Sequence, residues 1–594
     1  MPEPPSVPSP DRQALPVWFQ ERVEARLRIL YPAYQVAATL GRLCRLVAEH
    51  RRQYPPRQRE RWNQEDTILI TYGSSIQDQE GRHLETLNRF LVQQLTGTVN
   101  SVHLLPIFPY SSDDGFAVID YREVDAGLGD WQDVEHIGRD FNLMLDLVIN
   151  HCSRENLWFI DFINNVAPGK DWFIELDPGT DVSQVVRPRT SPLLVPVHTH
   201  CCVKHVWATF SEDQIDLNFA NPEVLLEFIS IFLFYVARGA RFIRLDAIAY
   251  LWKQLGTRCI HLRQTHEVVK LLRDIIEAAA PHCVLITETN VPNGENISYF
   301  GNSDEAHMVY QFSLPPLLLH ALYRGDASRL TRWAQDYPRA PRDCTYLNFT
   351  ASHDGIGLRP LEGILDPEEI DELVGAMREY GGYVTMRSHA DGSETPYEIN
   401  ITYFDALKGT WRGEDELQVP RFLCAQTVML ALQGIPAVYI HSLTATPNDY
   451  TGVEHSGRTR SINRHRWRLE ELERLLQEPG SPQALVFDEL RRRLRIRRQQ
   501  PAFHPESDQQ TLDLGSDLFA LWRSTKFQRI LAVSNMTERV VSVDLPAHPC
   551  DGPGALWRDL IGARDYPSGV GHIVLVPYQS LWLEPRREGG GHPQ

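Results

Sequence analysis

Short apolar, β-branched runs recur along most of the chain and alternate with amphipathic helical stretches. Eight such runs predict strands, at 67–72, 101–106, 143–150, 242–247, 283–288, 308–312, 345–354 and 435–440. A helical pattern is clear at 266–280, HEVVKLLRDIIEAAA, which ends before a proline. Eight strands that alternate with helices predict an α/β fold, a parallel (β/α)8 TIM barrel.

The rest of the pattern predicts additional domains around this barrel. Two gaps, after the third and seventh strands, are too long for plain connections and predict inserted subdomains that shape a site. Period-two segments such as LFALWRST near the end predict a C-terminal β-sandwich. The predicted parts are a disordered tail (1–16), a helical extension (17–65), the barrel (66–504) with insertions at 152–218 and 355–425, the β domain (505–585) and a second disordered tail (586–594).

Composition limits the classes of molecule that the protein could bind and indicates the cellular compartment in which it works. The chain has 77 acidic and 59 basic residues and a net charge of −18, which disfavours nucleic acid and anionic membranes. Nine cysteines without framework spacing indicate a reducing compartment. No signal peptide is recognised, and the apolar run 231–237 is too short to span a bilayer. We expect a cytoplasmic monomer or homodimer.

The stretch GARFIRLDAIAY (239–250) places two charges in a predicted buried strand. Residues two apart in a strand share a face, so Arg244 and Asp246 lie side by side. Buried charges are costly unless they are paired. For an isolated pair of this kind, a structural ion pair is the simpler explanation.

Similar polar residues follow several of the other predicted strands. They are Asp146, Asn150, His151, Glu288, His353 and Asp354. A barrel would bring the carboxyl ends of its strands to one rim, so three carboxylates (Asp246, Glu288 and Asp354) converge beside an arginine and two histidines. This convergence favours a catalytic site over separate structural pairs.

Cleavage of a glycosidic bond with retention matches this set. It needs a carboxylate nucleophile and a carboxylic acid about 5–5.5 Å apart. Arg244 favours the ionised form of Asp246, which predicts the nucleophile. Glu288 has no basic neighbour in sequence and is the candidate acid. Asp354 then stabilises the transition state, and His151 and His353 hold sugar hydroxyls.

Metal and cofactor chemistry have little support in the sequence. There is no HExxH motif and no paired-cysteine spacing of a zinc site, and phosphate-loop and dinucleotide signatures are absent. The cluster HTHCCVKH (198–205) is a minor candidate for zinc. We therefore expect no cofactor and no metal.

Four motifs, DLVINH, RLDA, ITETN and ASHD, resemble the conserved regions of the α-amylase superfamily of retaining glycosidases and transglycosylases, and QIDLN resembles its fifth. The match runs from about residue 66 to the C-terminus. HLLPIFPYSSDDGFAVIDY, VVRPRTSPLL, WATFSEDQIDLN, FSLPPLLLHAL and YEINITYFDAL further resemble the sucrose phosphorylase branch.

The resemblance implies roles for individual residues. It implies that Asp246 is the nucleophile, Glu288 the acid and base, and Asp354 the transition-state stabiliser. The implied glucose pocket consists of Asp113, Phe116, His151, Phe210, Arg244, His353 and Arg460.

A phosphorylase also needs positive charge for phosphate. VRPR supplies Arg187 and Arg189, and the resemblance implies Arg189 as the phosphate contact, with Tyr250. The alternative is that these arginines only pair with nearby acids such as Asp181.

Two positions depart from the sucrose phosphorylase pattern. Asn290 stands where histidine is expected, and Tyr397-Glu398 stands where Tyr-Gln is expected. The N-terminal extension, ITETNVPNGENISYFG and YEIN resemble the glucosylglycerate phosphorylases of the same branch more closely. The resemblance therefore implies transfer of glucose from an α-glucoside, glucosylglycerate being favoured, to inorganic phosphate, giving α-glucose 1-phosphate by double displacement.

Other activities stay open at this stage. They are phosphorolysis of sucrose, glucosylglycerol or sucrose 6′-phosphate, hydrolysis of a glucoside, and sugar binding by a non-catalytic barrel.

Overall fold

A closed barrel of parallel strands forms the centre of the computed structural model, which describes residues 15–56, 60–79, 81–388, 393–549, 555–569 and 571–587. Most of both predicted tails, 1–14 and 588–594, lies outside the described residues. In sequence order the barrel strands are β1 (Ile68–Thr71), β3 (Ser101–Leu104), β4 (Asn142–Leu147), β9 (Ala240–Leu245), β10 (Val284–Thr287), β11 (Met308–Tyr310), β12 (Thr345–Phe349) and β18 (Ile435–Tyr439).

All eight predicted strands are confirmed, and their apolar character follows from burial on both faces. Two predicted runs, 143–150 and 345–354, were too long at their carboxyl ends by three residues or more. The structure ends β4 at Leu147 and β12 at Phe349, because the polar residues that follow turn out of the sheet toward a cavity. The longer helices around the barrel are α3 (His83–Leu95), α4 (Trp131–Asp140), α6 (Pro222–Ala237), α7 (Arg263–Ala279), α9 (Leu314–Arg324), α10 (Ser328–Asp336), α12 (Gln418–Ala431) and α16 (Pro482–Arg497).

Two insertions rise from the carboxyl ends of β4 and β12. The first contains β5 (His151–Ser153), α5 (Leu157–Asn164), β6 (Leu194–His198), β7 (Val203–Trp207) and β8 (Gln214–Asp216). The second contains β13 (Ile356–Gly357), α11 (Pro367–Glu379), β14 (Tyr383–Ser388), β15 (Glu394–Asn400), β16 (Gly409–Thr410) and β17 (Gly413–Glu414). Here β13, β15 and β14 form one antiparallel sheet. The barrel helix α12 begins at Gln418, before the predicted end of this insertion at 425.

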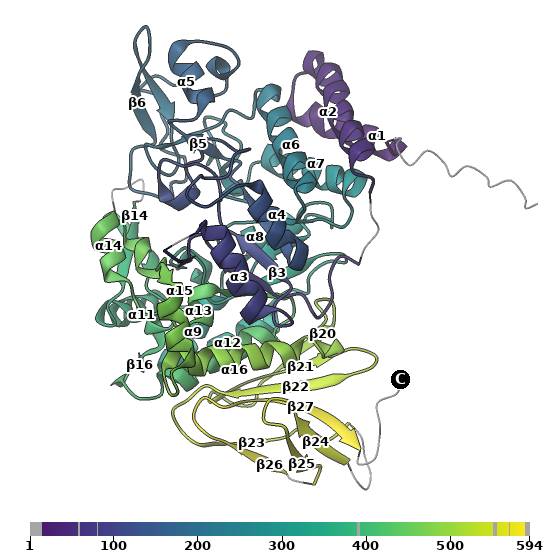
Figure 1. Ribbon diagram of the computed structural model, residues 1–594, viewed down its shortest axis with the longest axis vertical. Helices are drawn as coiled ribbons and strands as arrows, with labels where there is room; N and C mark the ends of the chain where they lie inside the picture. The colour runs from purple at the N-terminus through teal and green to yellow at the C-terminus, as the bar shows by residue number, and fades with distance from the viewer. Residues whose placement is uncertain are drawn as a thin grey trace, which may run out of the picture.

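The N-terminal extension is a helical pair, α1 (Val17–Leu30) and α2 (Ala33–Gln53), placed beside the barrel (Figure 1). α1 packs against α7, and α2 packs against α6. Arg26 on α1 lies 2.5 Å from Asp274 and 3.2 Å from Glu267, both on α7. The pair thus covers one side of the barrel, and Tyr31 between the two helices donates a 3.0 Å hydrogen bond to the carbonyl of Phe219.

The C-terminal domain is all β, and it lies at the opposite end of the molecule from α1 and α2 (Figure 1). Its six-stranded sheet has the order β20 (Asp508–Leu512), β21 (Leu518–Ser524), β22 (Arg529–Asn535), β27 (Ser580–Arg587), β24 (Ala555–Asp559) and β25 (Arg564–Pro567). A separate two-stranded antiparallel sheet of β23 (Val541–Asp544) and β26 (His572–Leu575) packs on one face, and Trp557 lies in the core between the two sheets. This arrangement confirms the predicted β-sandwich.

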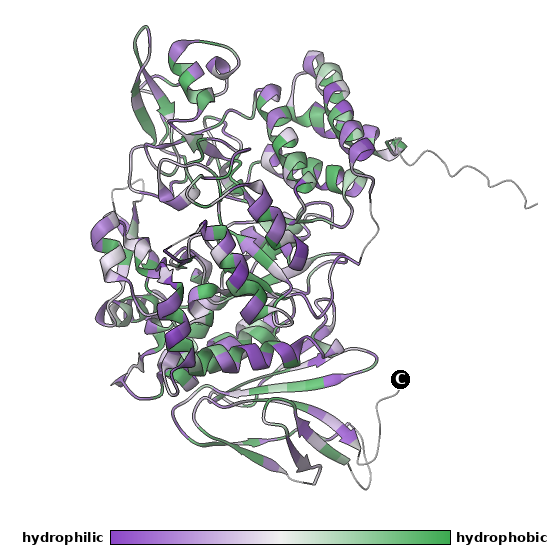
Figure 2. Cartoon of the chain, in the orientation of Figure 1, coloured by the Kyte–Doolittle hydropathy of each residue, from purple (hydrophilic) through white to green (hydrophobic). Residues whose placement is uncertain are grey.

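Helix α16 connects the barrel to this domain and carries both hydrophilic and hydrophobic residues along its length (Figure 2). Its apolar residues pack against α12, which in turn contacts β22 and β27. The remaining short elements are β2 (Ile76–Gln77), α8 (Asn293–Ile297), α13 (Ile440–Leu443), α14 (Tyr450–Ser456), β19 (Trp467–Arg468) and α15 (Leu469–Gln477). Within the described ranges, no helix is both long and apolar enough to cross a membrane.

Candidate active site

A chain of ion pairs explains the charges in β9. Asp146 on β4 and Arg244 on β9 are register partners, and Arg244 Nη1 lies 2.5 Å from Asp146 Oδ1 and 2.8 Å from Asp246 Oδ1. On its other side, Asp146 Oδ2 is 2.7 Å from Nε2 of His103 on β3. Burial alone would raise the pKa of Asp146, but His103 and Arg244 outweigh it and lower the pKa to about 2. Asp146 therefore stays ionised and fixes Arg244 beneath Asp246.

Asp246 and Glu288 face a cavity of about 480 Å³ at the carboxyl ends of β9 and β10. Burial raises the pKa of Asp246 to about 8; Arg244 opposes this shift and Glu288 adds to it. Burial also raises the pKa of Glu288, whose Oε2 accepts a 3.0 Å hydrogen bond from the Ala247 N–H. The expected effect of Arg244 on Asp246 is present, but burial exceeds it. Such a pair titrates as a unit.

The backbone beside Asp246 is strained. Ala247 has a φ of +51°, a left-handed conformation that alanine rarely adopts. It presents its N–H to Glu288 in this conformation. The loop after β9 thus orients both carboxylates from one short segment.

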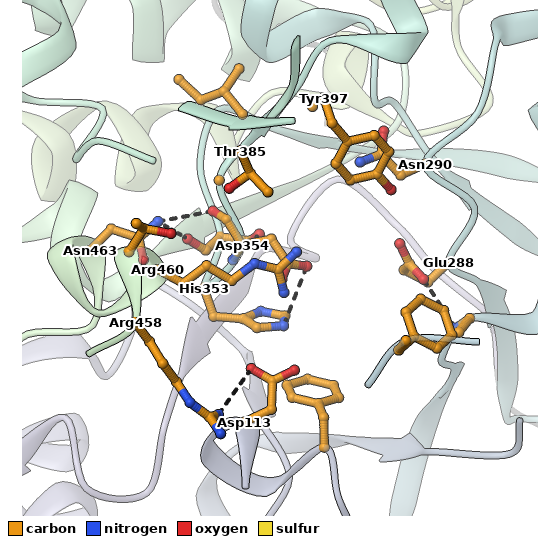
Figure 3. A pocket seen from close by; sticks show the side chains of 18 of the residues that line it. Asp113, Glu288, Asn290, His353, Asp354, Thr385, Tyr397, Arg458, Arg460 and Asn463 are labelled. Carbon is orange, nitrogen blue, oxygen red and sulfur yellow. Dashed lines mark hydrogen bonds and ion pairs between the residues drawn. The ribbon is translucent and has the colours of Figure 1, made fainter. Parts of the chain in front are cut away.

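The third carboxylate, Asp354, lies in a cluster of basic side chains (Figure 3). Its Oδ1 is 2.5 Å from Arg460 Nη1, and its Oδ2 is 3.4 Å from Nε2 of His353. Burial would raise the pKa of Asp354, but Arg460, His353 and Arg464 outweigh it and hold that pKa well below its usual range. Asp354 therefore stays ionised at neutral pH.

Asp113 lies on the same side of the cavity, in a turn whose backbone is also left-handed, with φ of +54°. Its Oδ1 is 3.4 Å from Arg464 and 3.8 Å from Arg458 (Figure 3). Arg464 also donates 2.9 Å to the carbonyl of His353 and 2.7 Å to Asp114. One arginine therefore ties the Asp113 turn to the strand end that carries Asp354.

Aromatic rings form the walls of this part of the cavity. Phe116 stacks on His353 with ring centroids 4.8 Å apart. Phe210 packs against His151 at 5.2 Å, and Tyr250 stands edge-on behind Phe210 at 5.5 Å. Apolar rings beside fixed hydroxyl-binding groups suit one face of a hexose.

The other side of the cavity, called the acceptor side below, is open and holds residues that the sequence predicts to contact phosphate or the group that leaves the sugar. Arg189, Asn290 and Tyr397 line it, and Figure 3 shows Asn290 and Tyr397 on the far side of Asp354 from Asp113. Arg189 lies over the Tyr397 ring at 5.6 Å. Among the described residues it has no hydrogen-bond partner, and Glu398 is 4.0 Å away.

Four of the predicted site residues do not line the cavity. Arg244 lies beneath it and Tyr250 behind Phe210. Glu398 is buried behind Arg460, whose guanidinium lines the cavity in its place. Arg187 is also set back, and its Nη2 is buried without a hydrogen-bond partner in the described part of the chain. The alternative partner, Asp181, accepts from the backbone of Ser183.

Sequence reasoning missed several residues that contribute to the cavity or support it. They are His103, Ser112, Gln214, Thr385, Arg458, Asn463 and Arg464. The run RSINRHR contained a signal, because Arg464 follows Arg460 by one helical turn in the same loop. Thr385 lies on β14, a strand of the second insertion that the sequence pattern did not resolve.

The histidine and cysteine cluster at 198–205 forms the hairpin of β6 and β7, away from the cavity. Cys201 and Cys202 at its tip are exposed, with sulfurs 3.3 Å apart. In the described residues no group of three or more His, Cys, Asp or Glu side chains is placed to hold a metal.

Comparisons with known proteins agree with this geometry. The family model described as "Alpha amylase, catalytic domain" matches residues 92–344. The chain is 44% identical to a glucosylglycerate phosphorylase of Allomeiothermus silvanus over 95% of its length and 98% of the relative. It is 40% identical to a glucosylglycerate phosphorylase of Escherichia coli over 95% of its length and all (100%) of that relative.

The chain is also similar to phosphorylases that are more distant in sequence. A sucrose phosphorylase of Streptococcus mutans is 33% identical over 70% of this chain and 84% of its own. The crystal structure of sucrose 6F-phosphate phosphorylase from Thermoanaerobacter thermosaccharolyticum superimposes with a TM-score of 0.69 at 26% identity, over 81% of this chain and 96% of that one. The chain belongs to the glycoside phosphorylases of the α-amylase superfamily.

Proposed function

We propose that this protein is a retaining glycoside phosphorylase that transfers glucose from glucosylglycerate to inorganic phosphate. One observation favours transfer to phosphate over simple cleavage of a glycoside. Arg189 projects into the cavity beside the carboxylates, without a hydrogen-bond partner among the described residues. A guanidinium left free in this way suits a phosphate or carboxylate oxygen.

In the first step Asp246 attacks the anomeric carbon of the glucoside. The bond from that carbon to glycerate breaks, and the leaving oxygen takes the proton of Glu288. The pair needs one proton, located on Glu288, and the 2.8 Å contact with Arg244 favours this arrangement by stabilising charge on Asp246. Asp354, held as an anion by Arg460, stabilises the positive charge that develops on the sugar ring.

In the second step phosphate replaces glycerate on the open side of the cavity. A phosphate oxygen attacks the anomeric carbon of the β-glucosyl enzyme while the Glu288 carboxylate accepts the proton of that phosphate. The bond to Asp246 breaks, and α-glucose 1-phosphate leaves with the configuration of the substrate. No step in this sequence needs a metal or an organic cofactor.

Glycerate is favoured as the acceptor because its carboxylate offers Arg189 the same kind of oxygen as phosphate does. Glucosylglycerate phosphorylases are 40% and 44% identical to this chain over 95% of its length, and these relatives support the assignment. Of the two residues that replace those expected of a sucrose phosphorylase, Asn290 lines this side, and Glu398 lies behind it at 4.0 Å from Arg189. The cytoplasmic location and the monomeric or dimeric state stay predictions.

The reverse reaction tests the proposal. The enzyme is incubated with α-glucose 1-phosphate and, in turn, D-glycerate, fructose, fructose 6-phosphate or glycerol, and release of inorganic phosphate is measured. Release that depends on glycerate is expected. Release with fructose alone would identify sucrose phosphorolysis instead, and equal release without any acceptor would mean that water is the attacking group.

A further inference from the structure

Glu398 is a buried carboxylate that the mechanism above does not use. It is 1% exposed and does not line the cavity. Its Oε1 accepts from the Gly355 N–H at 3.0 Å and from Arg460 Nε at 2.9 Å, and its Oε2 accepts from Arg460 Nη2 at 2.6 Å. A Cβ at Gly355 would lie 2.5 Å from Glu398 Cγ, so the backbone approaches this side chain as closely as only glycine permits.

Arg460 consequently bridges two carboxylates. Its Nε and Nη2 form a two-point contact with Glu398, and its Nη1 reaches Asp354 at 2.5 Å. A two-point contact fixes the plane of a guanidinium as well as its position. Glu398 therefore determines where the positive charge next to Asp354 lies.

The same carboxylate also acts on Arg189. Glu398 Oε2 is 4.0 Å from Arg189 Nη1, which is close enough for attraction and too far for a hydrogen bond. Arg189 carries no other ion pair in the described part of the chain and is 24% exposed in the cavity. The positive charge that an incoming anion meets is therefore reduced by Glu398.

We infer that Glu398 is a positioning residue with two opposing effects: it fixes Arg460 against Asp354, and it weakens anion binding at Arg189. This inference rests on the proposed function, because the anions concerned are phosphate and the glycerate carboxylate. A weaker hold on phosphate also favours release of α-glucose 1-phosphate, whose phosphoryl group occupies the same place. A neutral residue at this position would favour tight anion binding over a fixed Arg460.

Glutamine and aspartate at position 398 together separate these effects, because glutamine disturbs both and aspartate only the contact with Arg460. The glutamine amide offers one acceptor oxygen for three donors, and its NH2 group would face an Arg460 donor. Glu398→Gln also removes the negative charge near Arg189. Glu398→Asp is the matched control, because it keeps the charge and, being shorter, loses the two-point contact.

The test measures kcat and the KM for phosphate in wild type and both variants, together with direct calorimetric titration of inorganic phosphate without sugar. For Glu398→Gln we expect kcat to fall about 10- to 100-fold and phosphate to bind about 3- to 10-fold more tightly. For Glu398→Asp we expect a lower kcat with no gain in phosphate affinity. Thermal unfolding checks that both variants fold.

Other results would overturn the inference. Weaker phosphate binding by Glu398→Gln would mean that Glu398 helps to bind the anion, and an unchanged kcat would mean that Arg460 does not depend on it. A wild-type protein that binds no phosphate would remove the effect on Arg189. If wild type binds phosphate but releases none from α-glucose 1-phosphate with any acceptor, the proposed function fails, whereas the titration still decides the charge effect.

Discussion

The two sides of the cavity differ in how completely their charged groups are paired. On the sugar side, Asp146, Arg244, Asp354 and Arg460 each contact at least one opposite charge within 3 Å. On the acceptor side, Arg189 has its only ion-pair partner among the described residues at 4.0 Å. The charges of the first side are paired before any ligand arrives, whereas the second side keeps the charge of Arg189 available for a ligand.

This difference follows from what each side would bind in the proposed reaction. The glucosyl group occupies its side throughout both steps, so preorganised groups can act on the transition state without rearrangement. Glycerate and phosphate occupy the other side in turn, and a fully paired arginine could not serve both. Close ion pairs therefore predominate where one ligand stays, and a loosely paired arginine is found where two ligands alternate.

The largest expected effect comes from the nucleophile on the sugar side. Asp246→Asn should lower the formation of α-glucose 1-phosphate by about 10⁴-fold or more. The pKa of Asp246 is raised to about 8 in the folded protein, so the folded state holds the carboxyl proton more tightly than the unfolded chain does. The stability that this proton contributes is therefore lost as pH rises from about 4 through 8. Asparagine has no proton to lose, so the variant should gain thermal stability over wild type as pH rises from 5 to 8.

The loss of activity is measured as the rate at which α-glucose 1-phosphate forms, and the stability difference is measured by thermal unfolding of both proteins between pH 5 and 8. Turnover retained by Asp246→Asn would refute its role as nucleophile. A stability difference that shrinks as pH rises would refute the direction of the pKa shift.

The next effect is on the acceptor side. Arg189→Ala should raise the KM for phosphate about 10- to 100-fold, because a charged hydrogen bond to the anion is lost. Arg187→Ala is the matched control, since Arg187 does not line the cavity and should change that KM less. Steady-state kinetics with varied phosphate compare the two. An equal or larger effect of Arg187→Ala would reverse the assignment.

The dependence of kcat/KM on pH tests the proton shared by Asp246 and Glu288. The reactive form has one proton on the pair, so activity should fall on both sides of an optimum, and the alkaline limb, the loss of that last proton from Glu288, should lie above the ordinary pKa range of a glutamate. Burial is the largest cause of that position. Initial rates from pH 5 to 10 give the profile, and constant activity up to pH 10 would contradict a raised pKa.

The smallest effect on activity is expected outside the cavity. Arg26→Ala removes ion pairs between α1 and α7 and should lower the free energy of unfolding by about 1–3 kcal/mol with kcat unchanged. Arg28→Ala is the control, because the pair of Arg28 with Glu24 is exposed and contributes about 0.5 kcal/mol or less. Denaturant unfolding and kcat are measured for both. A marked loss of kcat in Arg26→Ala would show that the helical extension affects catalysis.

The sequence predicted the barrel because its strands are buried on both faces and are therefore continuously apolar, which separates them from the amphipathic helices. It also placed Asp246, Glu288 and Asp354 together, because strand ends in a barrel share a rim. The contacts of Glu398 could not be foreseen. They join β15 of the second insertion to Gly355, which follows β12, and to Arg460, which follows α14, and no local pattern records a contact between such distant segments.

The pKa of Asp246 was equally difficult to predict from its neighbours in the sequence. Arg244 is two residues from Asp246 and favours its ionised form, as expected. The extent of burial, which raises the pKa of Asp246 further than Arg244 lowers it, depends on side chains from all around the barrel rim. The net effect of burial and nearby charges on a pKa can be judged only from the three-dimensional structure.

The central claim is that Asp246 carries the glucosyl group between the two steps. The most direct test uses Glu288→Gln with α-glucosyl fluoride, whose leaving group needs no acid, so that the intermediate forms and then reacts slowly. Mass spectrometry of the digested protein should find one added hexosyl group on the peptide that contains Asp246. A hexosyl group on another residue, or none while the fluoride is consumed, would contradict the mechanism.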